Sequence, residues 1–230
     1  MGGKWVYLMR FVPSNWPVPV SPVFLQGKLI RLEPLVPDHE AELLKISEDI
    51  RIWRYLTSYA GSPDAMRDYV DASLRDHLCG TALPFVVRAT SDERVIGMTR
   101  LKNMSRENRK AVVGSWFAQS AWGSGANAES KLLLLKHAFE TLNCLRVEFQ
   151  TDSRNLRSRA ALAKMGAVEE GTLRSYLITT DGHRRDTVVF SVLEEEWPDV
   201  KGVLLSRLEK QCAKSIRRLR YRSRGGERVG

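Results

Sequence analysis

Cysteine is scarce in this chain of 230 residues, which contains only Cys79, Cys144 and Cys212. Three thiols that lie far apart, and are odd in number, build neither a disulfide framework nor a CxxC zinc knuckle. The four histidines show no ligand spacing with them, so we expect no metal site. This cysteine usage favours a reducing, cytoplasmic location.

Long hydrophobic runs are also missing, because no apolar stretch reaches the roughly 20 residues that a membrane helix needs. The hydrophobic fraction of 43% and the charged fraction of 27% are those of an ordinary globular protein. We therefore expect no membrane partner and one folded domain, and the sequence leaves a monomer and a homodimer both open.

Acidic residues are too few to balance the basic ones, and the net charge is +9. Residues 209–230 hold eight Lys and Arg against two Glu, a charge of +6 that leaves only +3 for the rest of the chain. A basic tail of this kind can contact nucleic acid, the ribosome or an anionic surface, or can simply be a solubilising end.

Composition divides the chain into three parts. Residues 1–24 are rich in proline between Pro13 and Pro22, which predicts an extended arm without helix. Residues 25–208 carry the regular hydrophobic patterns of a folded domain, and residues 209–230 form the basic tail.

The first half of the domain predicts a strand, two helices and a meander of strands. A helix should follow Asp38, with Ala41, Leu44 and Ile46 facing inward. Ser62 and Pro63 predict the start of a second helix that runs to about Leu78. The predicted strands are Lys28–Pro34, Phe85–Ala89, Val95–Leu101 and Ala111–Phe117.

The second half predicts helices between strands, and therefore a crossover connection. The predicted helices are Glu129–Leu142, Asn155–Met165 and one from Pro198 that grades into the tail. The predicted strands are Arg146–Thr151, Ala167–Gly171, Tyr176–Thr180 and Thr187–Leu193, with a hairpin turn at Asp181–Gly182. The whole order indicates an α/β (α+β) fold.

A glycine-rich loop, Trp122-Gly-Ser-Gly-Ala-Asn127, leads directly into the apolar helix. Gly123 and Gly125 would let successive backbone N–H groups point at one spot, and the helix dipole would favour an anion there. A pyrophosphate would suit this cradle. The motif is neither a Walker loop nor a Rossmann fingerprint, and a tight turn without a ligand is the alternative.

Three segments together carry a more specific signal. They are WGSGANAESKLLLLKHAFE (122–140), RVEFQTDSRNLRSRAALAKMGAVEEG (146–171) and GHRRDTVVFSVLEEEWP (182–198). In this order, the chain from about Leu25 to Leu208 resembles the GNAT acetyltransferase superfamily, in the branch that contains the ribosomal-protein N-terminal acetyltransferases.

The resemblance implies a GNAT fold, a mixed and centrally splayed β-sheet flanked by helices, with acetyl-CoA in the gap. It implies an N-acetyltransferase in which a primary amine, of a protein N-terminus or a small molecule, attacks the thioester directly. The implied cofactor-binding residues are Val113, Trp116, Phe117, Gly123, Ser124, Gly125, Ala126, Asn127, Asn155 and Ser158.

Ser158 is the implied catalytic residue, a general acid for the departing thiolate; otherwise it is a hydroxyl on a helix face. Asn155 is equally suited to cap the helix. Trp53 and Tyr55 lie where the family builds its acceptor pocket, so they are candidate substrate-binding residues, with packing as the alternative. The arginines at 154, 157 and 159 suit a solvated face.

Two departures from the family pattern weaken the resemblance at the site. Trp122 directly precedes Gly123, so the loop is one residue short and its phosphate contacts can differ. Val112 stands where the family often has a glutamate that serves as base. Proton removal is then left to water, to a substrate-side residue or to the amine's own equilibrium.

Other functions remain open on the sequence. The missing base and the short loop would suit a non-catalytic or decayed CoA-binding regulatory protein. A nucleic-acid binder would use the tail, but no stacking platform or helix-turn-helix pattern supports it. Of the remaining candidates, we expect His137 and Cys144 to be buried, His183 to be exposed, and Asp186 to form a salt bridge that fixes the last hairpin.

Overall fold

The computed structural model describes the backbone of residues 21–225 and the side chains of residues 21–211. Most of the predicted arm at 1–24 lies outside the described residues. So do the side chains over most of the predicted basic tail at 209–230.

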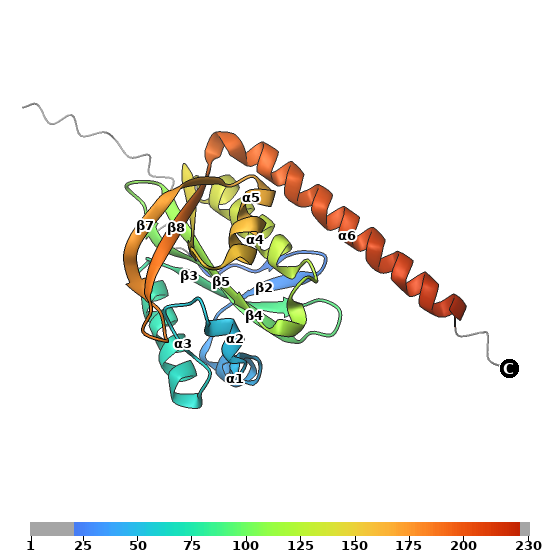
Figure 1. Cartoon of the computed structure of the whole chain (residues 1–230), viewed down its shortest axis with the longest axis horizontal. Coiled ribbons are helices and arrows are strands. Elements are labelled where there is room, and N and C mark those ends of the chain that lie inside the picture. Colours follow the sequence, from blue (N-terminus) through green and yellow to red (C-terminus); the bar gives the residue numbers. More distant parts are fainter. Residues whose placement is uncertain (1–20, 226–230) are drawn as a thin grey trace, which may run out of the picture.

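The centre of the fold is an eight-stranded sheet with the order β1-β2-β3-β4-β5-β6-β8-β7 (Figure 1). Every neighbouring pair is antiparallel except β5 and β6, which are parallel and are joined by the predicted crossover. The strands are β1 (Leu25–Gln26), β2 (Ile30–Pro34), β3 (Leu83–Ala89), β4 (Val95–Ser105), β5 (Lys110–Phe117), β6 (Arg146–Asp152), β7 (Val168–Ile178) and β8 (Arg184–Leu193).

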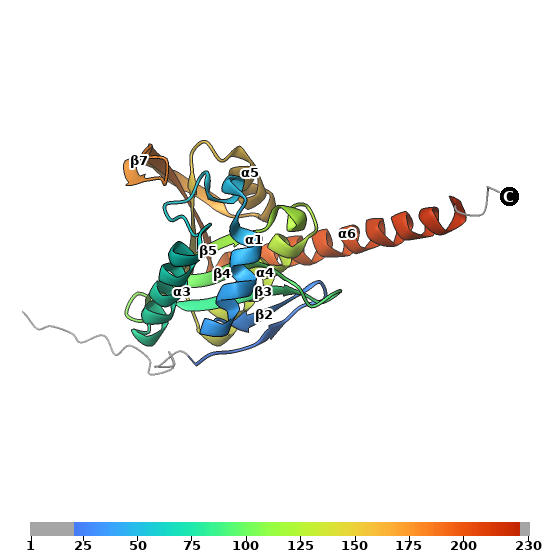
Figure 2. The same cartoon turned by 90° about the horizontal axis from the view of Figure 1, so that it is seen from below.

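Helices cover both faces of this sheet (Figures 1 and 2). On one face lie α1 (Glu40–Ser47), α2 (Ile50–Trp53) and α3 (Pro63–Leu78). On the other lie α4 (Ala126–Lys136), α5 (Leu156–Met165) and the first turns of α6 (Trp197–Gly225), whose far end projects beyond the sheet in both views. No helix in the described part of the chain is long and apolar enough to cross a bilayer.

Strand alternation divides the core into two clusters, one on each face of the sheet. On β3, Val86 packs in the cluster of Trp53 on α2, whereas Phe85 and Val87 pack in the cluster of Leu134 on α4. Successive strand residues point to opposite faces, so a strand buried on both sides reads as a continuous apolar run.

The two central strands part halfway along their length. Lys110–Val113 of β5 pair with Arg146–Phe149 of β6, and the ladder then ends. Beyond it Gly114–Phe117 pair only with β4, and Gln150–Asp152 pair only with β8. This confirms the mixed, centrally splayed sheet, and several of the candidate site residues lie at the opening.

The predicted inner face of the first helix is partly confirmed: Leu44 and Ile46 pack against the core cluster that contains Trp53, but Ala41 does not. Ala41 is exposed, whereas Leu43 and Ser47 are buried and Leu44 and Ile46 are only half-buried. The helix packs on the sheet through Leu43, and Ala41, two residues earlier, lies about 200° away around the helix and faces solvent.

Other element boundaries also differ from the prediction. The strands predicted at Ala167–Gly171 and Tyr176–Thr180 are one strand, β7, whose register with β8 shifts twice. The helix predicted to reach Leu142 ends in a π-helical turn at His137–Thr141. By contrast, the Ser62 hydroxyl accepts a hydrogen bond from the backbone N–H of Ala65 (3.4 Å) and Pro63 opens α3, as predicted.

The isolated candidates have clear positions. His137 and Cys144 are buried and His183 is exposed, as predicted. Burial raises the pKa of the Cys144 thiol to about 12, which makes it unreactive near neutral pH. The Asp186 carboxylate accepts a hydrogen bond from the backbone N–H of Ser175 (2.7 Å), and among the described residues it forms no ion pair, so this hairpin is fixed without the expected salt bridge.

Candidate functional site

The glycine-rich loop adopts a backbone that requires glycine at two positions. Gly123 has φ +77° and Gly125, the residue that precedes α4, has φ +98°. Between them the Ser124 hydroxyl donates to the carbonyl of Ala121 (2.7 Å) and accepts from the N–H of Ala126 (3.2 Å). A Cβ on Gly123 would meet nothing within 4 Å, so space remains beside this turn for a ligand.

A cavity of about 770 Å³ extends from this loop to the end of β5 and the start of α5. Its wall includes Phe117 from β5, Gly123, Gly125 and Asn127 from the loop and α4, and Asn155 from the start of α5. The charged side chains that line it are all basic: Arg51, Arg54, Lys131, Arg154, Arg157 and Arg207. A cavity with this lining favours an anionic ligand.

Two of these basic residues are held by neighbouring groups. The Arg157 guanidinium lies 3.8 Å from the centre of the Trp122 ring, a close cation–π contact that holds it beside the loop. Lys131 is buried and donates a hydrogen bond to the side-chain oxygen of Asn127. Burial, reinforced by the nearby charge of Arg207, lowers the pKa of Lys131 to about 8.

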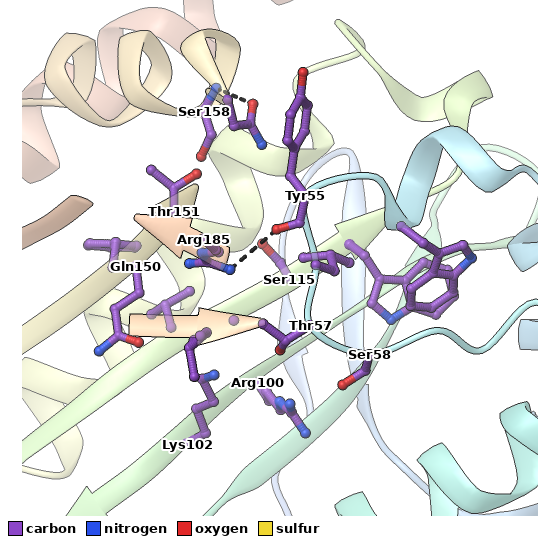
Figure 3. A pocket seen from close by; sticks show the side chains of 18 of the residues that line it. Tyr55, Thr57, Ser58, Arg100, Lys102, Ser115, Gln150, Thr151, Ser158 and Arg185 are labelled. Atoms are coloured by element: carbon purple, nitrogen blue, oxygen red, sulfur yellow. Dashed lines mark hydrogen bonds between the residues drawn. The ribbon is translucent and has the colours of Figure 1, made fainter. Parts of the chain in front are cut away.

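A second cavity, of about 170 Å³, opens on the side of α2 and the β4–β5 strands. It shares part of its wall with the larger cavity, so the two spaces adjoin at a junction. The shared residues are Tyr55, Leu56, Ser115, Trp116, Lys131, Asn155 and Ser158. Figure 3 shows Tyr55, Ser115 and Ser158 around this junction.

The start of α5 fixes one side of the junction. The Asn155 side-chain oxygen accepts a hydrogen bond from the backbone N–H of Ser158 (3.1 Å), so Asn155 is the N-cap of this helix. Ser158 lies in the first turn after this cap. It lines both cavities and its side chain is half-buried. Both interpretations of Asn155, cap and ligand contact, are compatible with this position.

Buried charges surround the junction. Burial opposes ionisation of Asp152, but hydrogen bonds from the side chain and backbone N–H of Arg154 outweigh it, and the pKa of Asp152 lies below its usual range. Arg185 is only 5% exposed, and burial lowers its pKa despite the nearby Asp152 charge. Its Nη1 donates to the carbonyl oxygen of Tyr55 (3.3 Å; Figure 3).

The two candidate acceptor residues lie in different surroundings. Trp53 is fully buried, its indole Nε1 donates to the carbonyl of Ser47 (2.7 Å), and its ring lies 5.2 Å from that of Trp116. It nevertheless forms part of the wall of the smaller cavity, whereas Tyr55 lies at the junction itself. A role in substrate binding therefore stays a prediction for both.

The structure brings most of the predicted residues together. Val113 lines the smaller cavity, Phe117 and the loop residues Gly123, Gly125 and Asn127 line the larger one, and Trp116, Asn155 and Ser158 line both. Ser124 and Ala126 line neither cavity. The N–H of Ala126 donates a hydrogen bond to the Ser124 hydroxyl within the loop, and Ala126 is buried in the core.

Sequence reasoning missed Lys131, Arg185 and the contribution of α6. A lysine directly before the run of four leucines at 132–135 was the available signal for Lys131. For Arg185 no signal existed, because the neighbouring Arg184 is exposed and only the strand register distinguishes them.

Two kinds of group are missing from the site within the described part of the chain. No Asp or Glu lines either cavity. No cluster of three His, Cys, Asp or Glu side chains close enough to hold a metal ion occurs among these residues.

Comparisons with known proteins agree with this geometry. Residues 30–168 match the family model described as "Acetyltransferase (GNAT) domain". The chain is 31% identical over 172 residues to "Putative ribosomal N-acetyltransferase YdaF" of Bacillus subtilis, covering 74% of this chain and 92% of that one.

Solved structures are similar over most of the chain. A "putative acetyltransferase" from T. thermophilus superposes with a TM-score of 0.74 and 38% identity, covering 82% of this chain and 98% of that one. Mycobacterium smegmatis RimJ, solved with CoA-disulfide, gives a TM-score of 0.69 and 26% identity, covering 84% and 96%. The splayed sheet, the loop at its opening and these matches lead to one conclusion: the chain belongs to the GNAT acetyltransferase family.

Proposed function

We propose that the protein uses acetyl-CoA to acetylate a primary amine, and that the amine is the N-terminus of a protein. One observation carries the proposal: two cavities, one beside the glycine-rich loop and one beside α2, meet at Ser158, Asn155 and Trp116. A transferase that joins two substrates needs two binding spaces with a common point at which the reacting atoms meet.

The residues around the larger cavity fit acetyl-CoA. The loop at Gly123 and the six basic side chains suit the phosphates. Past Val113 the edge of β5 is free of β6 and offers backbone groups to the amides of the pantetheine arm. The indole Nε1 of Trp116 is buried without a hydrogen-bond partner among the described residues, which suits a ligand acceptor atom.

When bound, acetyl-CoA supplies an acetyl group activated as a thioester. Around it, the hydroxyl of Ser158 would donate a proton to the departing sulfur, and donors on β5 would stabilise charge on the carbonyl oxygen. The attacking amine must lose a proton. With no carboxylate in either cavity wall, the neutral form of the Lys131 amine at the junction would accept it, and this form becomes the major one as the pH rises past the Lys131 pKa of about 8.

The choice of a protein N-terminus is supported by the relatives rather than by the cavities. The Bacillus subtilis relative is named for ribosomal N-acetylation and the Mycobacterium smegmatis structure is RimJ. A cytoplasmic location belongs to the same proposal. Fold and cofactor site alone do not select an acceptor.

Two measurements test the proposal. Titration of the full chain with acetyl-CoA in a calorimeter should show micromolar binding, and mass spectrometry should show an increase of one acetyl group on the N-terminus of a ribosomal-protein peptide. A peptide with a blocked N-terminus and a free lysine is the matched control. Acetylation of the control at an equal rate would contradict the choice of acceptor.

A second candidate is a CoA-binding protein without catalysis, and the absence of a carboxylate from both cavity walls favours it. It predicts the same acetyl-CoA affinity but no transfer to any amine. A single-turnover experiment with a panel of peptides and small amines separates the two candidates, because it does not depend on product release.

A further inference from the structure

The smaller cavity carries an unbalanced positive charge. Its charged lining residues are Arg100, Lys102, Lys131 and Arg185, and no Asp or Glu lines it. None of these four side chains forms an ion pair with a described residue. Confined cations without counter-charges cost free energy, and a ligand anion would offset this cost.

The lack of a counter-charge is clearest at Arg185. The residue is 5% exposed, and its Nε is buried with no hydrogen-bond partner among the described residues. The carboxylate of nearby Asp152 is occupied by Arg154, which binds both of its oxygens (3.0 and 2.8 Å). Arg185 is therefore left with the Tyr55 carbonyl at 3.3 Å, a neutral partner for a charged group.

Arg100 and Lys102 extend the charge along β4. They are two residues apart, so both point to the same face of the sheet and into the same cavity. Among the described residues, Arg100 contacts neutral partners, the Ser73 hydroxyl (3.4 Å) and the ring of Tyr69 (5.6 Å). Burial lowers the pKa of Lys102, and repulsion from Arg100 and Arg185 lowers it further, whereas the charge of Asp76, which does not line the cavity, acts in the opposite direction.

Three of the four charges lie away from the junction with the other cavity, whereas Lys131 lies at the junction itself. In the view of Figure 3, Ser158 lies at the top, Arg100 and Lys102 at the bottom, and Arg185 between them. If the amine of an acceptor reaches the junction, the atoms next to that amine would therefore lie against the basic side chains.

We propose that the smaller cavity selects an acceptor that carries an anionic group, a carboxylate or a phosphate, close to its reactive amine. The inference rests on the proposed function for the identity of the amine as the reacting group. It excludes polyamines and aminoglycoside-like drugs, whose several positive charges would meet Arg100, Lys102 and Arg185 at short range.

The test is an equilibrium measurement that needs no turnover. The full chain, saturated with CoA, is titrated with two peptides that have free N-termini and differ only in Asp or Lys at the second position. A second pair, a free amino dicarboxylic acid and a polyamine, shows whether the anion can come from a small molecule. We expect the acidic member of at least one pair to bind at least ~10-fold more tightly, with a preference that falls as salt is added.

Variants locate the effect. Arg100→Gln and Lys102→Gln, at positions that line the smaller cavity, should each reduce the acidic preference at least ~3-fold. Arg94→Gln removes the same charge from an exposed side chain on the β3–β4 hairpin and should leave the preference for the acidic ligand unchanged. Because Arg185 is buried, Arg185→Gln can test the ligand preference only if the variant stays folded, with an unfolding midpoint near that of the parent.

The outcomes separate this inference from the proposed function. If the Lys peptide and the polyamine bind as tightly as their acidic partners, or if no member of either pair binds, the anionic acceptor is wrong. If an acidic ligand binds preferentially but is never acetylated, the anion site stands and the transferase proposal falls.

Discussion

The side chain of Gln211 on α6 donates a hydrogen bond of 2.6 Å to the carbonyl oxygen of Gly123 in the glycine-rich loop. Its other terminal atom, Oε1, lies 2.9 Å from the position that a Cβ on Gly125 would occupy. Residues 88 positions apart in the sequence thus form one unit. The C-terminal helix supports the loop proposed to bind phosphate, so a substitution in the loop can also disturb the contact with Gln211.

Gly123 is the position at which charge can be tested without steric conflict. Gly123→Asp and Gly123→Asn have the same shape, and both residue types tolerate the left-handed backbone better than other side chains do. We expect Asn to retain acetyl-CoA binding within a few-fold and Asp to weaken it at least ~10-fold, since only Asp repels the phosphates. Calorimetry on both variants measures this, and equal affinities would mean that the loop is only a turn.

Gly125→Asp should behave differently, because its backbone φ of +98° strains any side chain and the ends of two neighbouring side chains would also have to move. A Cβ there would lie 2.9 Å from both Gln211 and Leu29. We expect a loss of unfolding free energy of about 1–3 kcal/mol in addition to weaker binding. Thermal unfolding without ligand distinguishes it from Gly123→Asp, which should lose less stability.

Removing the Ser158 hydroxyl tests the general acid. Ser158→Ala should lower kcat about 10²-fold or less with little change in the affinity for acetyl-CoA. Asn155→Asp is the matched control for helix capping, because Asp caps as well as Asn, whereas Asn155→Ala should cost about 1 kcal/mol of stability. Unchanged kinetics in Ser158→Ala would leave it as a hydroxyl on a helix face.

Glu129 is a buried side chain that joins α4 to the first hairpin. Its carboxylate accepts hydrogen bonds from the backbone N–H groups of Lys28 (2.8 Å), Leu29 (2.7 Å) and Ile30 (2.9 Å). Glu129→Ala leaves all three donors without their acceptor and should destabilise the fold by about 3 kcal/mol or more. Glu129→Gln keeps one acceptor oxygen, so its free energy of unfolding, measured in urea, should lie between those of Glu129→Ala and the parent.

Lys131 should make stability depend on pH in the alkaline range. Its pKa falls from the ordinary 10.5 to about 8 in the folded protein, so between these values the unfolded chain binds more protons and stability rises with pH. Below pH 8 both states are protonated and the penalty, at most about 3 kcal/mol, is fully present.

Lys131→Met removes this charge with similar bulk. At pH 7 it should raise the free energy of unfolding, and its advantage over the parent should shrink as pH rises from about 8 to about 10. Lys136→Met, on the exposed side of the same helix, is the control and should change stability by less than about 0.5 kcal/mol. A constant advantage for Lys131→Met across this range would disprove the buried-charge explanation.

Several features could be predicted from the residues alone: the order of helices and strands, the start of α3 at Ser62 and Pro63, the glycine-rich loop before α4, and the family. They depend on residues close together in the chain, such as a cap with its proline, a glycine with its turn, or an apolar run with its flanking polar residues. The splay between β5 and β6 followed from the family resemblance rather than from any local pattern.

Which side chains meet was set by packing between distant segments, and no local pattern predicted it. The packing of α1 on the sheet buries Leu43 and leaves Ala41 exposed. The register of β8 buried Arg185 and exposed Arg184, and α6 crossed the loop at Gln211. These outcomes depend on helix packing and strand register, and in a strand a shift of one residue moves every side chain to the other face of the sheet.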